Sequence, residues 1–139
     1  RKGDTLPVAL AMAIAIGAAS GLHYAHDRVG FDGRPLKIVH RDVSPTNVMV
    51  TYDGCVKVAD FGIAKVTSRT DVTRAGIRKG KVPYMSPEQC SSRPIDRRSD
   101  VFALGVILHE LLSGERLFKR KDAEGTMLAI AVEPIPPPH

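Results

Sequence analysis

Two short polar segments of the sequence carry side chains suited to phosphoryl transfer. Residues 40–47 read H-R-D-V-S-P-T-N, and residues 60–62 read D-F-G. Transfer of a phosphoryl group needs a carboxylate that orients the attacking hydroxyl and accepts its proton, and oxygen ligands that hold Mg²⁺ against the phosphates of a nucleotide. Asp42 fits the first role, and Asn47 and Asp60 fit the second.

Each piece also has an ordinary structural interpretation when it is taken alone. The H-R-D tripeptide could form a polar turn, Asp42 could cap a turn before Pro45, and the D-F-G tripeptide could end a strand. The combination is more informative than its parts. An acid, a downstream amide and a second acid beyond a predicted hairpin together match a known phosphoryl-transfer signature.

A hairpin is predicted between the two polar segments. The β-like runs over residues 48–52 and 55–59 flank Asp53-Gly54, which is the strongest short signal for a two-residue hairpin turn. Such a turn folds both acids and the amide toward one another. Glycines and a proline at positions 30, 33 and 35 predict an irregular loop before the first polar segment.

An Ala-rich helix is predicted before that loop, over residues 6–27. Asp4 or Thr5 is available as its N-cap, and Pro7 lies in its first turn, where a missing N–H costs nothing. Its basic start and small residues imitate a signal peptide, but its hydrophobicity is low for a membrane span. The pattern therefore favours a buried helix over a membrane segment, and no membrane contact is expected.

Two further helices are predicted in the second half of the chain. The run over residues 101–112 is apolar almost all round and is closed by Gly114, which indicates a central helix. A shorter helix is predicted over residues 123–132. The fold class is therefore α+β, mainly helical with one small hairpin.

Composition excludes some classes of function. The 139 residues are 43% hydrophobic and 25% charged, as in a soluble globular chain. The net charge of +5 comes with only 5% aromatic residues and no Trp, so nucleic-acid binding is not favoured. Cys55 and Cys90 have no metal-binding spacing, which suits a reducing compartment, and a cytoplasmic location is expected for this segment.

Over nearly its whole length the sequence resembles the serine/threonine protein kinases, especially their bacterial eukaryote-like members. Besides the two polar segments, Y-M-S-P-E-Q at residues 84–89 resembles the A-P-E region, and D-V-F-A-L-G at residues 100–105 resembles the start of the central helix. L-H-Y-A-H at residues 22–26 resembles the end of the helix before the catalytic loop. The resemblance implies a partial kinase domain over residues 1–139, comprising the C-terminal lobe without the N-terminal lobe.

The same resemblance implies an activity and site residues. It implies transfer of the γ-phosphate of ATP, with Mg²⁺, to Ser or Thr hydroxyls of protein substrates. Asp42 would be the base, and Asn47 and Asp60 the metal ligands. The other implied positions are the adenine-site residue Met49, the spine residues His40 and Phe61 with the adjoining Gly62, the anchor Glu88, and Asp100, which holds the catalytic loop. The alternative is a pseudokinase or docking module without turnover, and the retention of both acids and the amide argues against it.

The sequence departs from the family pattern in ways that bear on activity. The glycine-rich loop, its lysine and the late arginine that should pair with Glu88 have no candidates. We therefore expect a piece of a longer kinase that binds MgATP weakly, has no appreciable turnover alone and tends to aggregate through uncovered apolar surface. Residues 28–37 also lengthen the link into the catalytic loop.

The final two expectations concern cations and hydroxyls near the site. Ser44 stands where these kinases usually have lysine, and Lys81 stands where they usually have threonine. Lys81 is expected to supply the missing cation, which would offset charge on the transferred phosphate and hydrogen-bond Asp42, with the Ser44 hydroxyl replacing that of the threonine. The alternative is a solvent-facing Lys81. Regulation is expected through phosphates in the basic loop between residues 63 and 83, which would pair with Arg41. The alternative is that this loop is merely a solvated face. The candidate acceptors in that loop are Thr67, Ser68, Thr70 and Thr73.

Overall fold

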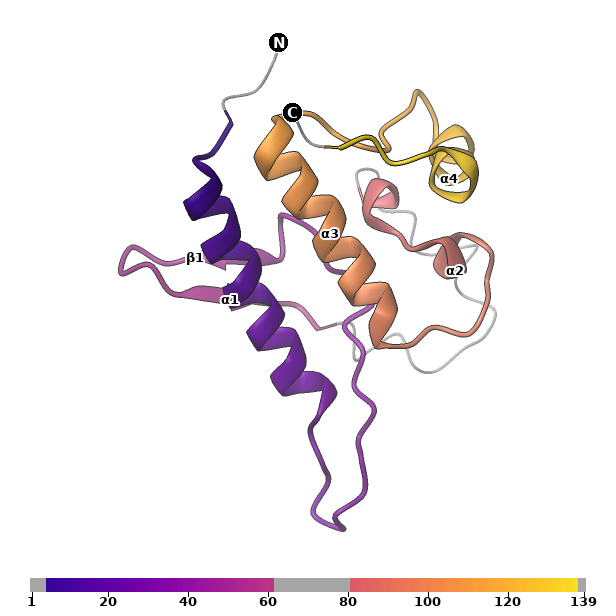
Figure 1. The fold of residues 1–139 in the computed structure, drawn as a ribbon. Helices are drawn as coiled ribbons and strands as arrows, with labels where there is room; N and C mark the ends of the chain where they lie inside the picture. The colour runs from indigo at the N-terminus through magenta and orange to yellow at the C-terminus, as the bar shows by residue number, and fades with distance from the viewer. Residues whose placement is uncertain (1–4, 62–80, 138–139) are drawn as a thin grey trace.

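The structure is a computed structural model that describes residues 5–61 and 81–137. Helical elements dominate it, with one two-stranded antiparallel sheet, as the α+β prediction required (Figure 1). In chain order the elements are α1 (Val8–His26), β1 (Val48–Val50), β2 (Val56–Val58), the 3₁₀ helix η2 (Val82–Tyr84), α2 (Pro87–Cys90), α3 (Arg97–Ser113) and α4 (Ala123–Val132). The predicted bounds of α4 agree with the structure.

Helix α1 begins later than predicted. Pro7 is its N-cap, with ψ 136°, and the Pro7 carbonyl accepts the N–H groups of Leu10 and Ala11. The predicted cap at Thr5 is therefore wrong, and Asp4 lies outside the described residues. The helix starts here because extended Pro7 supplies a free carbonyl and its own missing N–H is not needed.

One face of α1 is buried, and the other is open. The buried positions recur at helical spacing and pack against α3 and β2; they are Ala11, Ala15, Ala18, Leu22 and Ala25. By length and composition alone α1 could cross a membrane, and only 22% of its most apolar window is buried. Core helices and signal sequences have the same length and composition, so these two properties are weak evidence for a membrane segment. The prediction of a buried helix holds for one face only.

The hairpin forms where it was predicted, but its strands are shorter. Val48 pairs with Val58, and Val50 pairs with Val56. The turn is longer than the predicted two residues, because the Thr51 N–H bonds the Cys55 carbonyl at 2.9 Å and leaves three residues between them. Gly54 has φ 86°, which matches the hairpin loop that ends in a left-handed residue.

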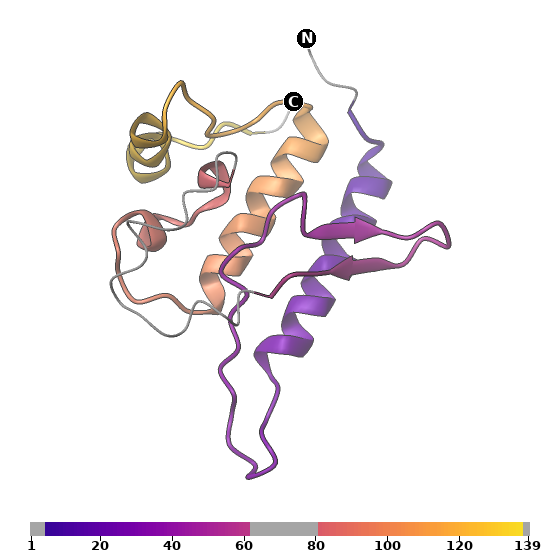
Figure 2. The ribbon, with the colours of Figure 1, turned by 180° about the vertical axis from the view of Figure 1, so that it is seen from behind.

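Helix α3 lies between α1 on one side and the α2 and α4 region on the other (Figures 1 and 2). It starts one turn before the predicted position, because the Asp96 side chain caps it by accepting the Arg98 N–H at 2.9 Å. It ends at Gly114, whose φ of 70° gives the predicted left-handed C-terminus. Its central position agrees with the prediction.

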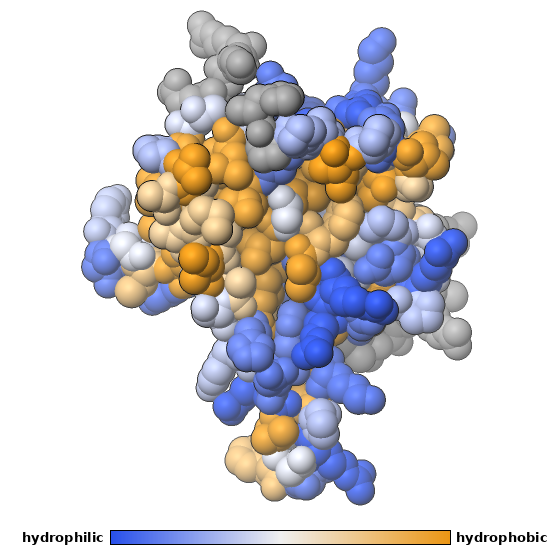
Figure 3. All heavy atoms as spheres, viewed as in Figure 1, coloured by the Kyte–Doolittle hydropathy of each residue, from blue (hydrophilic) through white to orange (hydrophobic). Residues whose placement is uncertain are grey.

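The hydrophobic core gathers around α3 and reaches the 40–47 loop. Its buried members are Leu22, Val43, Tyr84, Ala103, Val106, Ile107, Phe118, Ala129 and Ile130. Beyond this core, apolar side chains gather on the face of the molecule seen in Figure 3. The exposed large apolar residues of α1 include Val8, Leu10 and Ile16. Burial of Val43 inside the core fixes the loop to the helices, so the site described next is built on a packed support.

The segment over residues 28–37 forms a narrow arm that extends away from the helices (Figures 1 and 2). Gly30 donates to the Arg34 carbonyl and Leu36 donates to the Arg28 carbonyl, each at 2.8 Å. Phe31 is fully exposed. The extra length expected from the sequence is therefore accommodated outside the core.

Candidate active site

Asp100 holds the backbone of the 40–47 loop from the first turn of α3. Its carboxylate is 1% exposed and accepts the backbone N–H groups of His40 and Arg41, each at 2.8 Å. His26, at the end of α1, places Nε2 2.8 Å from the same carboxylate. A buried charge is stable only with such partners. The loop is therefore attached to both long helices through one side chain.

His40 connects the loop to the end of the hairpin. Its fully buried ring lies 2.9 Å from the Ala59 carbonyl through Nε2, and Nδ1 accepts the Asp42 N–H at 3.3 Å. A carbonyl can only accept and an amide N–H can only donate, so the ring carries its proton on Nε2. The Phe61 ring packs on it, with centroids 4.5 Å apart. The two polar segments are thus held side by side.

Asn47 and Asp60 are brought near each other by the base of the hairpin. The Ala59 N–H donates to the Asn47 carbonyl at 2.8 Å, which places Asp60 directly beyond this pairing. Asn47 is 3% exposed, and its Nδ2 donates to the Asp42 carbonyl at 2.8 Å. With Nδ2 engaged in this way, Asn47 keeps Oδ1 as an acceptor, to which Thr46 Oγ1 comes within 3.4 Å.

Asp60 is exposed and has φ 58°, in the left-handed region that costs a non-glycine residue about 1–3 kcal/mol. An amide oxygen and a carboxylate that lie close together are suitable oxygen ligands for Mg²⁺, which is usually bound by one or two carboxylates together with phosphates and waters. Within residues 5–61 and 81–137 there is no group of three His, Cys, Asp or Glu that could hold a metal by itself. The residues present fit Mg²⁺ that is shared with a nucleotide.

Asp42 carries an ion pair with a residue from a distant segment. The Lys81 Nζ lies 2.5 Å from Asp42 Oδ2, and the two side chains are only 22% and 18% exposed. The alternative of a solvent-facing Lys81 is therefore wrong. Ser44 is 2% exposed and its hydroxyl lies 2.9 Å from Thr46 Oγ1, a contact within its own loop. Met49 is half exposed on β1.

Arg41 has a strained backbone that side chains hold from both ends. Its φ is 66°, its N–H is bound by Asp100, and its carbonyl accepts Nε2 of Gln89 at 2.8 Å. Gln89 is itself fixed by a capping box on α2, in which its Oε1 accepts the Ser86 N–H at 2.9 Å. Sequence reasoning missed Gln89 and His26, although both lie in motifs that it quoted.

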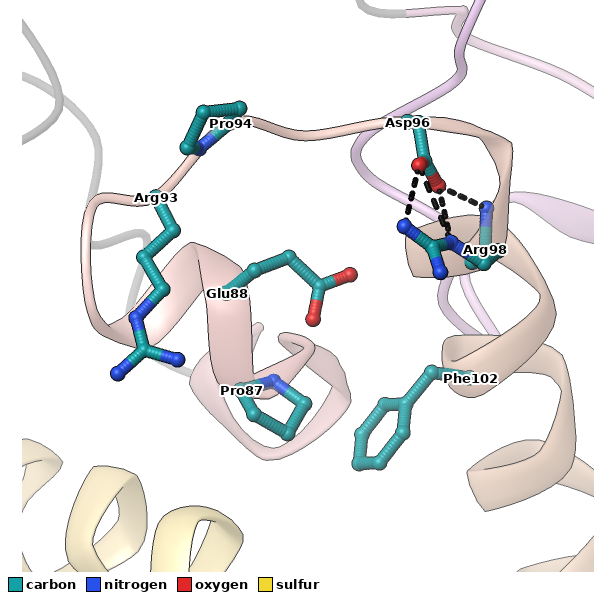
Figure 4. A pocket seen from close by; sticks show the side chains of 7 residues that line it. All are labelled: Pro87, Glu88, Arg93, Pro94, Asp96, Arg98 and Phe102. Atoms are coloured by element: carbon teal, nitrogen blue, oxygen red, sulfur yellow. Dashed lines mark hydrogen bonds and ion pairs between the residues drawn. The ribbon is translucent and has the colours of Figure 1, made fainter.

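Glu88 does not lack a partner. The hydroxyl of Ser99, which is 1% exposed, donates to Glu88 Oε1. Burial acts to raise the pKa of Glu88, but hydrogen bonds from Ser99, its own amide and Ser86 outweigh burial and lower it. Its carboxylate faces a pocket of about 520 Å³ beside the Asp96–Arg98 pair (Figure 4). One oxygen of Glu88 therefore has a partner, although the sequence offers no late arginine to pair with it.

The remaining predicted site residues lie outside the described part of the chain. These are Gly62 and the four candidate phosphate acceptors Thr67, Ser68, Thr70 and Thr73. The side chains that the structure does describe at the site converge from α1, the hairpin, α2 and α3. They place a carboxylate, an amide and a second carboxylate around the exit of one short hairpin, which is the arrangement of a phosphoryl-transfer lobe.

A family model of the protein kinase domain matches residues 2–135. This chain therefore belongs to the protein kinase family, and its mainly helical architecture with one hairpin is that of the C-terminal lobe.

Named relatives come from several bacteria. The chain is 46% identical over 139 residues to a tyrosine-protein kinase, MasK, of Myxococcus xanthus, covering 100% of the chain and 22% of the relative. It is 42% identical over 118 residues to the serine/threonine-protein kinase drp72 of Corynebacterium efficiens, covering 85% and 21%. It is 34% identical over 142 residues to the serine/threonine-protein kinase PknL of Mycobacterium tuberculosis, covering 95% and 34%. The chain spans about a fifth to a third of the length of these relatives.

Proposed function

We propose that this chain is the catalytic lobe of a protein serine/threonine kinase, which transfers the γ-phosphate of MgATP to hydroxyl groups of protein substrates. The observation that carries the proposal is the assembly of Asp42, Asn47 and Asp60 at the hairpin, through the Asn47–Asp42 hydrogen bond and the Ala59–Asn47 pairing. Relatives named as kinases support it.

The side chains divide the work between them. Asp42 orients the acceptor hydroxyl and takes its proton as the oxygen attacks the γ-phosphorus. Asn47 Oδ1 and the Asp60 carboxylate are the oxygens that would hold Mg²⁺, which, when bound, offsets charge on the nucleotide phosphates. Asp100 and His40 keep these groups in place through their hydrogen bonds to the loop and to the hairpin. Such positioning supplies much of the rate in reactions of this kind.

A complete enzyme needs more than this lobe. We propose that an N-terminal kinase lobe in a longer chain clamps the ATP phosphates, consistent with the short span of the relatives that is matched here. The isolated 139 residues should then bind MgATP weakly and show no appreciable turnover. We also propose a cytoplasmic location for this lobe, supported by Cys55 and Cys90, which are both free thiols.

The test is phosphoryl transfer by the purified full-length protein, with labelled ATP, Mg²⁺ and a general acceptor protein. Label on serine or threonine is expected, and Asp42→Asn should lower kcat by about 100-fold or more while ATP binding persists. Asp53→Asn, at the exposed hairpin tip, is the matched control and should leave kcat unchanged.

Two results would redirect the proposal. A folded wild-type protein that binds its partners but transfers no label would establish the docking module instead. Label on tyrosine would place the acceptor class with the MasK relative, whose name is that of a tyrosine kinase.

A further inference from the structure

The Lys81–Asp42 ion pair joins the proposed base to a cation from a distant segment of the chain. The Lys81 Nζ lies 2.5 Å from Asp42 Oδ2, although 39 positions separate the two residues in sequence. Both side chains are largely shielded from water. Shielding strengthens the interaction of a point charge with any anion that enters the same space.

The Lys81 backbone is held by packed structure. Lys81 is the N-cap of η2, and its carbonyl accepts the Tyr84 N–H at 3.1 Å. All three residues of η2 are buried, and the Tyr84 hydroxyl donates to Glu110 of α3 at 2.8 Å. The ammonium is therefore positioned by an anchored turn.

No cationic side chain follows Asp42 within the 40–47 loop. Between Asp42 and Asn47 the residues are Val, Ser, Pro and Thr. Ser44 is buried and its hydroxyl is hydrogen-bonded to that of Thr46, so at this point the loop has two hydroxyl groups that contact each other. Within the described part of the chain, the ammonium of Lys81 forms an ion pair with the Asp42 carboxylate.

We infer that Lys81 is a catalytic residue, whose ammonium binds the transferred phosphoryl group while it holds the Asp42 carboxylate. This inference rests on the proposed kinase function. An ammonium has three N–H donors, so one can stay on Asp42 while another reaches a phosphoryl oxygen. The acceptor oxygen forms its bond to the γ-phosphorus as the bond to the ADP oxygen breaks, the hydroxyl proton passes to Asp42, and Lys81 remains protonated throughout.

This placement makes catalysis depend on the segment that anchors Lys81. A lysine within the 40–47 loop would stay beside Asp42 whatever the following segment did. Lys81 arrives only when η2 is docked on α3, so a change that detaches η2 removes the cation and lowers the rate without altering Asp42.

The test uses the full-length protein and measures kcat, KM for ATP and ATP binding. Lys81→Met should lower kcat about 100-fold, as expected for losing one preorganised donor, while ATP affinity changes little. Lys81→Arg should retain more of the activity than Lys81→Met. The matched control is Lys121→Met, in an exposed connection before α4, which should leave kcat unchanged.

A double-substitution cycle tests whether the cation can be moved. Ser44→Lys and Lys81→Thr should each lower kcat, and the combined variant should exceed the product of the two single effects by at least about tenfold. An unchanged kcat in Lys81→Met overturns the inference, and so does an increase, which would make the ion pair an inhibitory contact. Absence of transfer by the wild-type protein would instead refute the proposed function.

Discussion

Asp100→Asn tests the hydrogen bonds that fix the 40–47 loop, because it replaces one oxygen of a buried carboxylate, which His26 also contacts, with an NH₂ group. Asp100 is 1% exposed and receives the N–H groups of His40 and Arg41 on different carboxylate oxygens. The asparagine amide can accept on only one side. In either orientation its NH₂ faces a buried backbone N–H, and that N–H loses its acceptor.

The cost follows from these two contacts. A buried donor left without an acceptor costs about 1–3 kcal/mol, and the remaining bond loses about 1 kcal/mol because its acceptor is no longer charged. The loop should therefore open more easily by about 2–4 kcal/mol, which corresponds to about 30- to 700-fold faster amide exchange. Hydrogen exchange of peptides covering residues 38–47, measured by mass spectrometry in the full-length protein, reads this quantity locally.

Asp96→Asn is the matched control, since it makes the same substitution four residues earlier at the N-cap of α3. Asparagine caps a helix as well as aspartate does, and the pair with Arg98 is exposed to solvent and contributes little to stability. Its effect should be small and confined to the start of α3. If the amides of residues 38–47 exchange at the same rate in both variants, Asp100 does not hold the loop in the way described.

Three further predictions concern single positions. Gly17→Ala should destabilise the protein by about 1–3 kcal/mol in thermal unfolding, because the new Cβ would lie 2.6 Å from Val56 Cβ; Gly21→Ala, with its nearest atom at 3.6 Å, should not. Burial raises the pKa of Glu110 above its usual 4.5, so the ionised form costs stability as pH rises above that value; Glu110→Gln should gain melting temperature relative to wild type as pH rises above about 4.5, and a pH-independent difference would contradict this. Gln89→Glu, which keeps the capping acceptor but sets a carboxylate oxygen against the Arg41 carbonyl, should lower both kcat and melting temperature, as an activity assay and thermal unfolding would show together.

Features set by neighbouring residues were predictable from the sequence. The hairpin, the left-handed Gly114 and the position of α4 follow from turn chemistry and helical periodicity, and the structure agrees. The errors are also local. The strands end early because Gly54 closes a three-residue loop, and α1 starts late because Pro7 caps it with its carbonyl. Competing caps within a few residues cannot be ranked by composition alone.

Contacts between distant segments were less accessible. The sequence indicated that Asp100 holds the loop, through family resemblance, but nothing in its spacing indicated that His26 shares the same carboxylate. Gln89 is similar: its amide reaches the Arg41 carbonyl only because α2 and the loop are brought together by the core. Such pairings depend on the packed fold, and a single sequence does not contain that information.

These long-range contacts explain how a strained loop can persist. Arg41 adopts a left-handed backbone that would cost about 1–3 kcal/mol alone. Asp100 binds its N–H and Gln89 binds its carbonyl, so the conformation is fixed from α3 and from α2 together. Lys81 and Gln89 belong to one segment of the chain, because η2 directly precedes α2. The segment that sets the loop backbone is therefore also the segment that delivers the cation to Asp42, and displacing it would disturb both at once.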